Sequence, residues 1–167
     1  AHCASPMAEV AQGLDRPRPR CTACGWTYYA RNSLGAAVLI ERAETILLVQ
    51  RAPPPYLGDW MLPAGFVEYG EDATLTAVRE AEEECGVHVL VCGTPGVHFG
   101  TDDPRNPGYL LVYRATLVDP EATPKPGDDA RACAWFGRDD LPPNVAFMAH
   151  RTAISAWREH GTPTGIG

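Results

Sequence analysis

The amino-acid sequence from residue 33 onward predicts an α/β fold. Short apolar runs rich in β-forming residues alternate with turn-rich joins, as is typical of the strands of a sheet. Two longer segments, residues 72–85 and 145–159, have the apolar spacing of helices instead. A chain of 167 residues is long enough for one domain with its own core and a small appendage.

The strands are expected at residues 34–41, 45–51, 87–92, 108–118 and 130–136. Only a short polar turn separates the first two strands, which predicts a hairpin. The three prolines that follow the second strand exclude a central strand there, because proline has no backbone donor for the ladder.

The segment 72–85 has the strongest helix pattern in the chain, since it contains no Gly or Pro and is followed by Gly86 as a C-cap. Its expected buried face consists of Leu75, Val78, Ala81 and Cys85. In the second helix we expect an apolar face with Ala149, Ile154 and Trp157, and His150 at the surface.

Composition and charge limit the possible functions. Acidic residues outnumber Lys and Arg by 21 to 14, a net charge of −7, which argues against a nucleic-acid partner. No apolar run is long enough to span a bilayer and no signal-peptide pattern opens the chain, so we expect a cytoplasmic protein without a membrane partner. In that reducing compartment Cys85, Cys92 and Cys133 are expected to be core residues.

Three glutamates of the 72–85 helix share one face. Glu80, Glu83 and Glu84 stand at positions i, i+3 and i+4, where like charges repel each other. Such a face is either solvated or a set of oxygen ligands for a hard cation such as Mg²⁺ or Mn²⁺.

The sequence around these glutamates favours the cation site. Residues 65–87 resemble the signature of the Nudix hydrolases, G-x5-E-x7-R-E-U-x-E-E-x-G-U, in which U is an aliphatic residue. All nine specified positions are met, and chance would give this on the order of 10⁻⁸ per register. The resemblance implies an α/β/α sandwich with a mixed β-sheet between helices, and metal-dependent hydrolysis of a diphosphate linkage.

The resemblance also assigns roles within the motif. Glu80 and Glu84 are expected to ligate Mg²⁺ or Mn²⁺ directly, and Glu83 to be a further ligand or the base that activates water. The backbone carbonyl of Gly65 is a further expected metal contact. The catalytic set is completed by Arg79 and Glu71, which should orient the glutamates.

Outside the motif, the resemblance gives weaker candidates. Glu68 often lies near the metal cluster in this family, and Asp128 or Asp129 could supply a later acidic ligand. Arg51 and Phe147 are candidates for substrate binding, with Phe147 near a nucleobase.

Residues 1–32 differ from the rest of the chain in composition and pattern. They contain three cysteines and an Arg-Pro repeat, and they have no sustained helix or strand period. They resemble the zinc ribbon that precedes some Nudix domains, with Cys21 and Cys24 as one knuckle and Cys3 as half of the other. Zinc needs four ligands, so either the chain begins inside the motif or His2, water or nothing completes the site. The expected organisation is a zinc-ribbon-like segment at 1–32, a Nudix domain at 33–160 and a flexible tail at 161–167.

The implied substrate is a small nucleotide, a nucleoside diphosphate derivative of the ADP-ribose, FAD or NADH type. The alternatives are a nucleoside triphosphate pyrophosphohydrolase and a non-catalytic Nudix domain that senses a nucleotide. A homodimer is compatible with the sequence. Neither the exact substrate nor the catalytic base can be read from these residues, because both depend on loops outside the motif.

Overall fold

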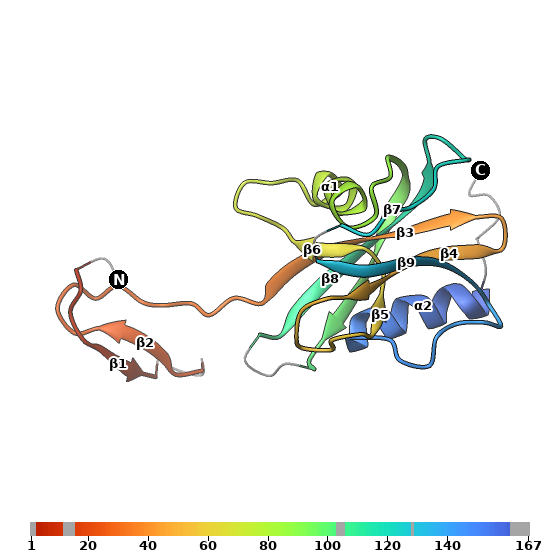
Figure 1. Cartoon of the computed structure of the whole chain (residues 1–167). Coiled ribbons are helices and arrows are strands. Elements are labelled where there is room, and N and C mark those ends of the chain that lie inside the picture. The colour runs from red at the N-terminus through yellow and green to blue at the C-terminus, as the bar shows by residue number, and fades with distance from the viewer. Residues whose placement is uncertain (1–2, 12–15, 103–105, 128, 161–167) are drawn as a thin grey trace. The chain divides into compact units, whose positions relative to one another are not determined.

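Residues 33–160 are built around a seven-stranded mixed sheet (Figure 1). The computed structural model describes residues 3–11, 16–102, 106–127 and 129–160. The elements of this part are β3 (Ser33–Arg42), β4 (Thr45–Arg51), β5 (Trp60–Met61), β6 (Ala64–Phe66), α1 (Ala73–Cys85), β7 (Val89–Gly100), β8 (Gly108–Leu117), β9 (Ala130–Gly137) and α2 (Met148–His160). The strand order is β5-β4-β3-β8-β7, with β6 beside β3 and β9 beside β4. The pair β3–β8 is parallel and the other pairs are antiparallel, including the predicted β3–β4 hairpin.

The two helices cover opposite faces of the sheet (Figure 1). On one face, alternate residues of β3 pack with α1 in a buried cluster that includes Ala36, Val38, Ile40, Ala77, Ala81 and Cys85. On the other face, the intervening residues of β3 pack with α2 in a cluster that includes Ala37, Leu39, Ala153, Ile154 and Trp157. Because both faces are buried, β3 is a continuous apolar run. The predicted α/β/α sandwich is confirmed.

Helix α1 begins and ends where the sequence predicts. The Asp72 side chain accepts a hydrogen bond from the Thr74 N–H at 2.8 Å, and Gly86 caps the other end with a φ of 63°. The predicted burial of Leu75 was wrong, since this side chain is 63% exposed. The inward face of α1 carries Glu80 and Glu84 instead, which turns Leu75 toward solvent.

Helix α2 begins at Met148, three residues later than predicted. Residues 144–146 are held extended beside β5, because the Trp60 N–H donates to the Asn144 carbonyl and the Ala146 N–H donates to the Trp60 carbonyl. Phe147 follows in the left-handed region with a φ of 52°, which prevents an earlier helix start.

The strand predicted at residues 87–92 continues to Gly100 as the edge strand β7. Its pairing with β8 is irregular between Cys92 and Gly96. Cys92 lies at this irregularity and is exposed, so its predicted place in the core was wrong, whereas Cys85 is buried and Cys133 is partly buried. In the described part of the chain, no helix has the length and apolar character needed to cross a membrane.

The chain divides into two units, residues 1–32 and residues 33–167. The first unit contains an antiparallel pair that the sequence did not predict, β1 (Met7–Val10) and β2 (Arg18–Cys21). These strands are only four residues long, and β2 has a proline between two arginines, so they leave no apolar period to detect. The expected flexible tail at 161–167 lies outside the described residues.

Candidate active site

A cavity of about 370 Å³ lies beside the glutamates of α1 and is lined by Glu80, Glu83, Glu84, Gly127 and Asp129. Glu80 and Glu84 are 8% and 7% exposed, whereas Glu83 is exposed to solvent. The structure therefore brings together four of the carboxylates that the sequence singled out. They come from a helix and from a segment more than forty residues later.

Arg79 holds the acidic residues of the motif in place. One Nη donates to Glu80 and to Glu83, each at 2.7 Å, and Nε donates to Glu71 at 3.1 Å. The hydrogen bonds from Arg79 lower the pKa of Glu71 to about 2. Glu71 also accepts from the backbone N–H of Glu68 at 3.1 Å. Arg79 and Glu71 thus have the geometry of positioning residues, as expected from the motif.

Burial disfavours the charged form of the two inner glutamates. It raises the pKa of Glu84 to about 8 and also raises the pKa of Glu80, although Arg79 opposes the shift at Glu80. The Ala64 N–H donates to Glu84 Oε2 at 2.9 Å and does not offset the burial. Two buried carboxylates that face a polar cavity suit a divalent cation, because Mg²⁺ and Mn²⁺ prefer oxygen ligands and would compensate the charge.

Gly65 lies in close contact with Glu80. A Cβ atom at position 65 would stand 1.9 Å from Glu80 Oε1 and 2.4 Å from its carboxyl carbon. Only glycine leaves room for this approach between β6 and α1, which explains the requirement for glycine at the start of the motif.

The segment 125–127 docks on the C-terminal end of α1 and brings Asp129 to the cavity. The Lys125 N–H donates to the Cys85 carbonyl at 2.8 Å, and the Gly127 N–H donates to the Glu84 carbonyl at 3.1 Å. These bonds satisfy carbonyls that a helix end leaves free. Asp128 lies outside the described residues, and Glu68 is exposed and is not among the residues that line this cavity.

A second cavity of about 760 Å³ contains both candidate substrate-binding residues, Arg51 and Phe147. The guanidinium of Arg51 lies 4.8 Å from the centre of the Phe147 ring, and the Tyr56 ring meets Phe147 edge-on at 4.8 Å. Gly65 and Phe66 also line this cavity. Aromatic rings beside a cation form a wall of the kind that binds a nucleobase.

Asp102, which was not predicted from the sequence, connects the segments that carry Tyr56 and Phe147. Its carboxylate accepts from the Met148 N–H at 2.8 Å, from Arg151 at 2.7 Å and from the Tyr56 hydroxyl at 3.4 Å. Tyr56 and Phe147 both have positive φ, 64° and 52°, a strained conformation for aromatic residues. No local signal in the sequence could reveal these contacts, since they join segments about fifty residues apart.

His150 also lines the large cavity, and its predicted surface position was wrong because it is only 4% exposed. Its spacing from Ile154 and Trp157, at i+4 and i+7, was the sequence signal for burial. Within the described residues its Nδ1 has no hydrogen-bond partner. Burial, together with Arg51, lowers the pKa of His150 to about 3.

Acid should therefore destabilise the protein through His150. The unfolded chain takes up a proton near pH 6.5 and the folded chain only near pH 3, so stability falls as the pH drops through this window. The free energy of unfolding of the wild-type protein should therefore fall between pH 7.5 and pH 5. We expect this fall to be smaller by about 2 kcal/mol in His150→Gln. Urea unfolding at both pH values measures it, with the exposed His160→Gln as control. An unchanged pH dependence in His150→Gln would contradict the assignment.

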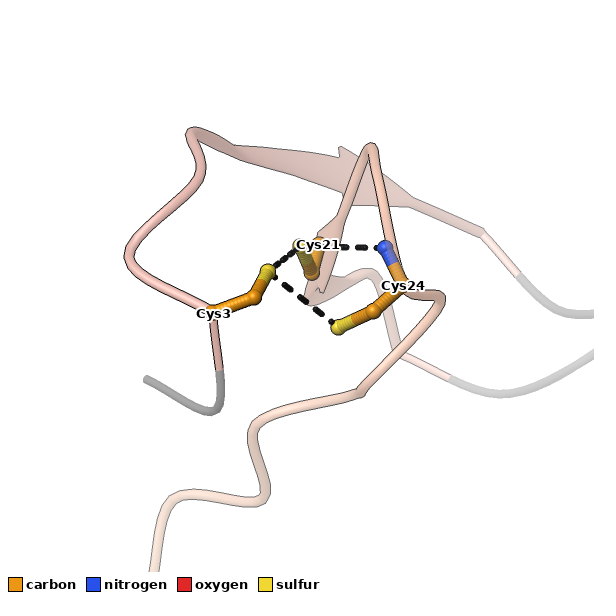
Figure 2. A group of neighbouring side chains, drawn as sticks. All are labelled: Cys3, Cys21 and Cys24. Carbon is orange, nitrogen blue, oxygen red and sulfur yellow. Dashed lines mark hydrogen bonds between the residues drawn. The ribbon is translucent and has the colours of Figure 1, made fainter.

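In the N-terminal unit, Cys3, Cys21 and Cys24 bring their sulfur atoms together (Figure 2). The Cys3 Sγ lies 3.4 Å from that of Cys21 and 3.5 Å from that of Cys24. Thiolates that share a tetrahedral zinc ion stand about 3.8 Å apart, so the cluster fits three of its four ligands. His2, a candidate for the fourth, lies outside the described residues.

Comparisons with known proteins agree with this geometry. The model of the NUDIX domain family matches residues 31–157. An ADP-ribose pyrophosphatase from Methanocaldococcus jannaschii is 35% identical over 120 residues, which cover 71% of this chain and 69% of that protein. The NAD-capped RNA hydrolase NudC from Chromobacterium violaceum is 35% identical over 152 residues, 90% of this chain but only 54% of that protein. The crystal structure of a NUDIX hydrolase from Nitrosomonas europaea superimposes with a TM-score of 0.83 at 27% identity, covering 95% of this chain and 89% of that chain.

The sandwich fold and the carboxylate-lined cavity thus define a hydrolase that acts on pyrophosphate bonds. The chain belongs to the NUDIX family. The resemblance drawn from residues 65–87 is confirmed, and divalent-metal dependence is general in this family.

Proposed function

We propose that the protein hydrolyses the diphosphate linkage of ADP-ribose, releasing AMP and ribose 5-phosphate. The diphosphate would lie at the cavity lined by Glu80, Glu84 and Asp129, and the adenosine would lie in the large cavity beside Phe147. The similarity to an ADP-ribose pyrophosphatase over 71% of the chain supports this choice of substrate.

The observation that carries the proposal is the common wall of the two cavities. Gly65 lines the large cavity and touches Glu80, which lines the small one. Arg51 lines the large cavity, and its positive charge also interacts with Glu84, whose pKa it acts to lower. A ligand with a nucleoside at one end and a diphosphate beside it matches this arrangement, and Arg51 is placed to attract the phosphates.

Each residue near the small cavity has a distinct proposed task. Glu80, Glu84 and the Gly65 carbonyl would hold Mg²⁺ or Mn²⁺, with Asp129 as a further ligand. When bound, the cation neutralises the diphosphate and polarises its phosphorus. Glu83, the exposed member of the helix trio, has access to water and is the proposed base. Arg79 and Glu71 keep these carboxylates oriented.

Product identification tests the proposal. The full chain is incubated with Mg²⁺ or Mn²⁺ and ADP-ribose, NADH, FAD or nucleoside triphosphates, and the products are separated by chromatography. We expect AMP from ADP-ribose, and none in the presence of a chelator. Pyrophosphate released from a triphosphate as the dominant reaction would favour the triphosphatase alternative. Tight binding of ADP-ribose without any cleavage, in folded and metal-loaded protein, would favour the sensing alternative.

NAD-capped RNA is a second candidate substrate. The match to an NAD-capped RNA hydrolase covers 90% of this chain, so it must include part of residues 1–32, which lie before the catalytic unit. The reaction would split the same kind of diphosphate and leave RNA with a 5′-monophosphate. Release of nicotinamide mononucleotide from a synthetic NAD-capped oligonucleotide tests it, and intact capped RNA after complete ADP-ribose turnover would exclude it.

We also propose that Cys3, Cys21 and Cys24 bind zinc. Freshly purified protein should contain stoichiometric zinc by plasma mass spectrometry, and Cys21→Ser should lose it because two thiolates rarely retain the ion. Cys92→Ser changes an exposed thiol outside the cluster and serves as the control. Zinc-free wild-type protein would contradict this assignment. Homodimer formation stays a prediction that light scattering can test.

A further inference from the structure

The charge of the chain is divided unevenly between its two units. Residues 1–32 contain four arginines and two acidic residues, a net charge of +2. The other residues contain 10 basic and 19 acidic residues, a net charge of −9. A basic unit attached to an acidic enzyme is a recognised sign of a polyanionic partner. The net charge of the whole chain conceals this unit.

A small sheet carries the basic residues. Arg18 and Arg20 stand two positions apart on β2, so both side chains project from one face of the strand. Residues 26–28 add to the other edge of β2, where the Tyr28 N–H donates to the Pro19 carbonyl at 2.8 Å and Thr27 pairs with Arg20. The neighbouring cysteine cluster connects β2 to Cys3. The arginines are therefore presented by a fixed backbone.

Among the residues of this unit that the structure describes, no acidic side chain pairs with the guanidinium groups of the sheet. No ion pair of Arg16, Arg18 or Arg20 is recorded among the described residues, where Arg20 donates to the Gly25 carbonyl at 3.1 Å and Arg18 lies 4.7 Å from the centre of the Tyr29 ring. Glu9, the acidic residue of β1, stands opposite Pro19 in the β1–β2 ladder. The positive charge is available to an external anion.

Three aromatic rings accompany these arginines. Trp26, Tyr28 and Tyr29 are 41%, 49% and 55% exposed, although large aromatic side chains are usually buried. The rings of Trp26 and Tyr28 stand 6.2 Å apart at a tilt of 47°. Tyr29 shares the face of Arg18, whereas Trp26 and Tyr28 project from the opposite face of the short sheet, because Thr27 between them pairs with Arg20. An exposed ring beside arginines is an element with which proteins bind single-stranded nucleic acid, since a base stacks on the ring and phosphates meet the guanidiniums.

We infer that residues 16–29 form a binding surface for single-stranded nucleic acid. Arg16, Arg18 and Arg20 contact the phosphates, and Tyr29, on the same face as Arg18, stacks with an unpaired base. A duplex fits poorly, because its bases are already stacked. The hydrolysis of a small nucleotide does not need this surface, so the inference goes beyond the proposed reaction and does not depend on it.

Fluorescence anisotropy with the full chain tests the inference. The probes are a fluorescein-labelled 12-nucleotide oligoadenylate RNA, the DNA of the same sequence and a duplex. Every protein in this experiment carries Glu84→Gln, which prevents cleavage of the probe. We expect a Kd of about 1–10 µM for single strands at 50 mM NaCl, and weaker binding of the duplex. Equal affinity for RNA and DNA would mean recognition through phosphates and rings, and tighter RNA binding would add contacts to the 2′-hydroxyl. Either outcome would support the proposed binding surface.

Matched variants separate phosphate contacts from stacking. Arg18→Ala with Arg20→Ala should weaken binding by about tenfold at 50 mM NaCl and reduce the salt slope by about 1.4. Tyr29→Ala should weaken binding about fivefold without changing the slope, and Tyr29→Phe should restore it. Arg131→Ala with Arg158→Ala removes the same charge from exposed sites of the other unit and should have little effect.

Three results would overturn the inference. The first is no binding at about 100 µM protein. The second is an equal loss in the Arg131/Arg158 control, which would make the effect one of overall charge. The third is displacement of the RNA by AMP at concentrations that fill the catalytic pocket, which would place the oligonucleotide there. Zinc content and circular dichroism verify that each variant of the N-terminal unit is folded.

Discussion

Replacing Glu84 with glutamine should abolish turnover and leave the fold intact. The loss should exceed about 100-fold in kcat, because Glu84 is the proposed direct metal ligand and should matter more than outer partners, whose removal costs about 10–100-fold. The fold should survive because the glutamine side chain keeps an oxygen that accepts the hydrogen bond from the Ala64 N–H, and because a neutral side chain suits this buried position. Product chromatography and thermal unfolding measure the two effects.

Glu82→Gln provides the matched control for this experiment. Glu82 lies on the same helix and is exposed, and its recorded ion pair is a 3.8 Å contact with His88 away from the cavity. We expect activity close to wild type for this variant. Wild-type activity in Glu84→Gln, or an equal loss in both variants, would show that the catalytic centre has been misplaced.

Replacing Gly65 with alanine should reduce kcat by about 100-fold with little loss of stability. The new Cβ would lie 1.9 Å from Glu80 Oε1, so the carboxylate has to move by about an ångström, and a misplacement of that size is expected to cost 10²-fold in rate. The displaced atoms are the end of a flexible side chain, which can shift without disturbing the core. Steady-state kinetics and thermal unfolding separate the two effects.

Gly137→Ala is the control for the glycine substitution. At position 137 a Cβ would be 3.7 Å from Asp140 Oδ2, an ordinary contact, and the residue lies outside both cavities. This variant should keep wild-type kinetics. If Gly65→Ala instead unfolded the protein, the tight contact would be a packing requirement rather than a catalytic one.

The sequence predicted those elements whose structure is decided by residues within the element itself. Helix α1 has both caps in adjacent residues, and the doubly buried β3 is apolar without interruption. Prediction from the sequence failed where contacts with a distant segment decide the local structure. The start of α2 is set by hydrogen bonds to Trp60, and the burial of His150 is set by the wall of the large cavity. The bonds to Trp60 leave no mark within the segment that they hold, whereas His150 stands at helical spacing from Ile154 and Trp157, a signal that was overlooked.

The same difference separates the two parts of the candidate site. The acidic residues of α1 were predictable because they stand at fixed spacings within one continuous motif. Arg51 and Phe147 were found by resemblance, but Tyr56 and Asp102 were missed, since their importance lies in a contact between loops about fifty residues apart. Glu68 was singled out from the resemblance as a weaker candidate for the metal site; its backbone N–H donates to Glu71 Oε2, and it does not line the small cavity.

The separate origins of the two cavities have a consequence for how new specificities could arise. The small cavity is built by α1 and the segment that docks on it, whereas the large one is lined by strands of the sheet, the start of α2 and the loops that carry Tyr56, Asp102 and Phe147. In the proposed binding mode, substitutions at Tyr56 or Phe147 can therefore alter the preferred nucleoside while the carboxylates of α1 stay constant. Gly65 and Arg51 are exceptions, since each acts on both sides. A library for altered substrate choice should leave these two positions fixed and vary the loops.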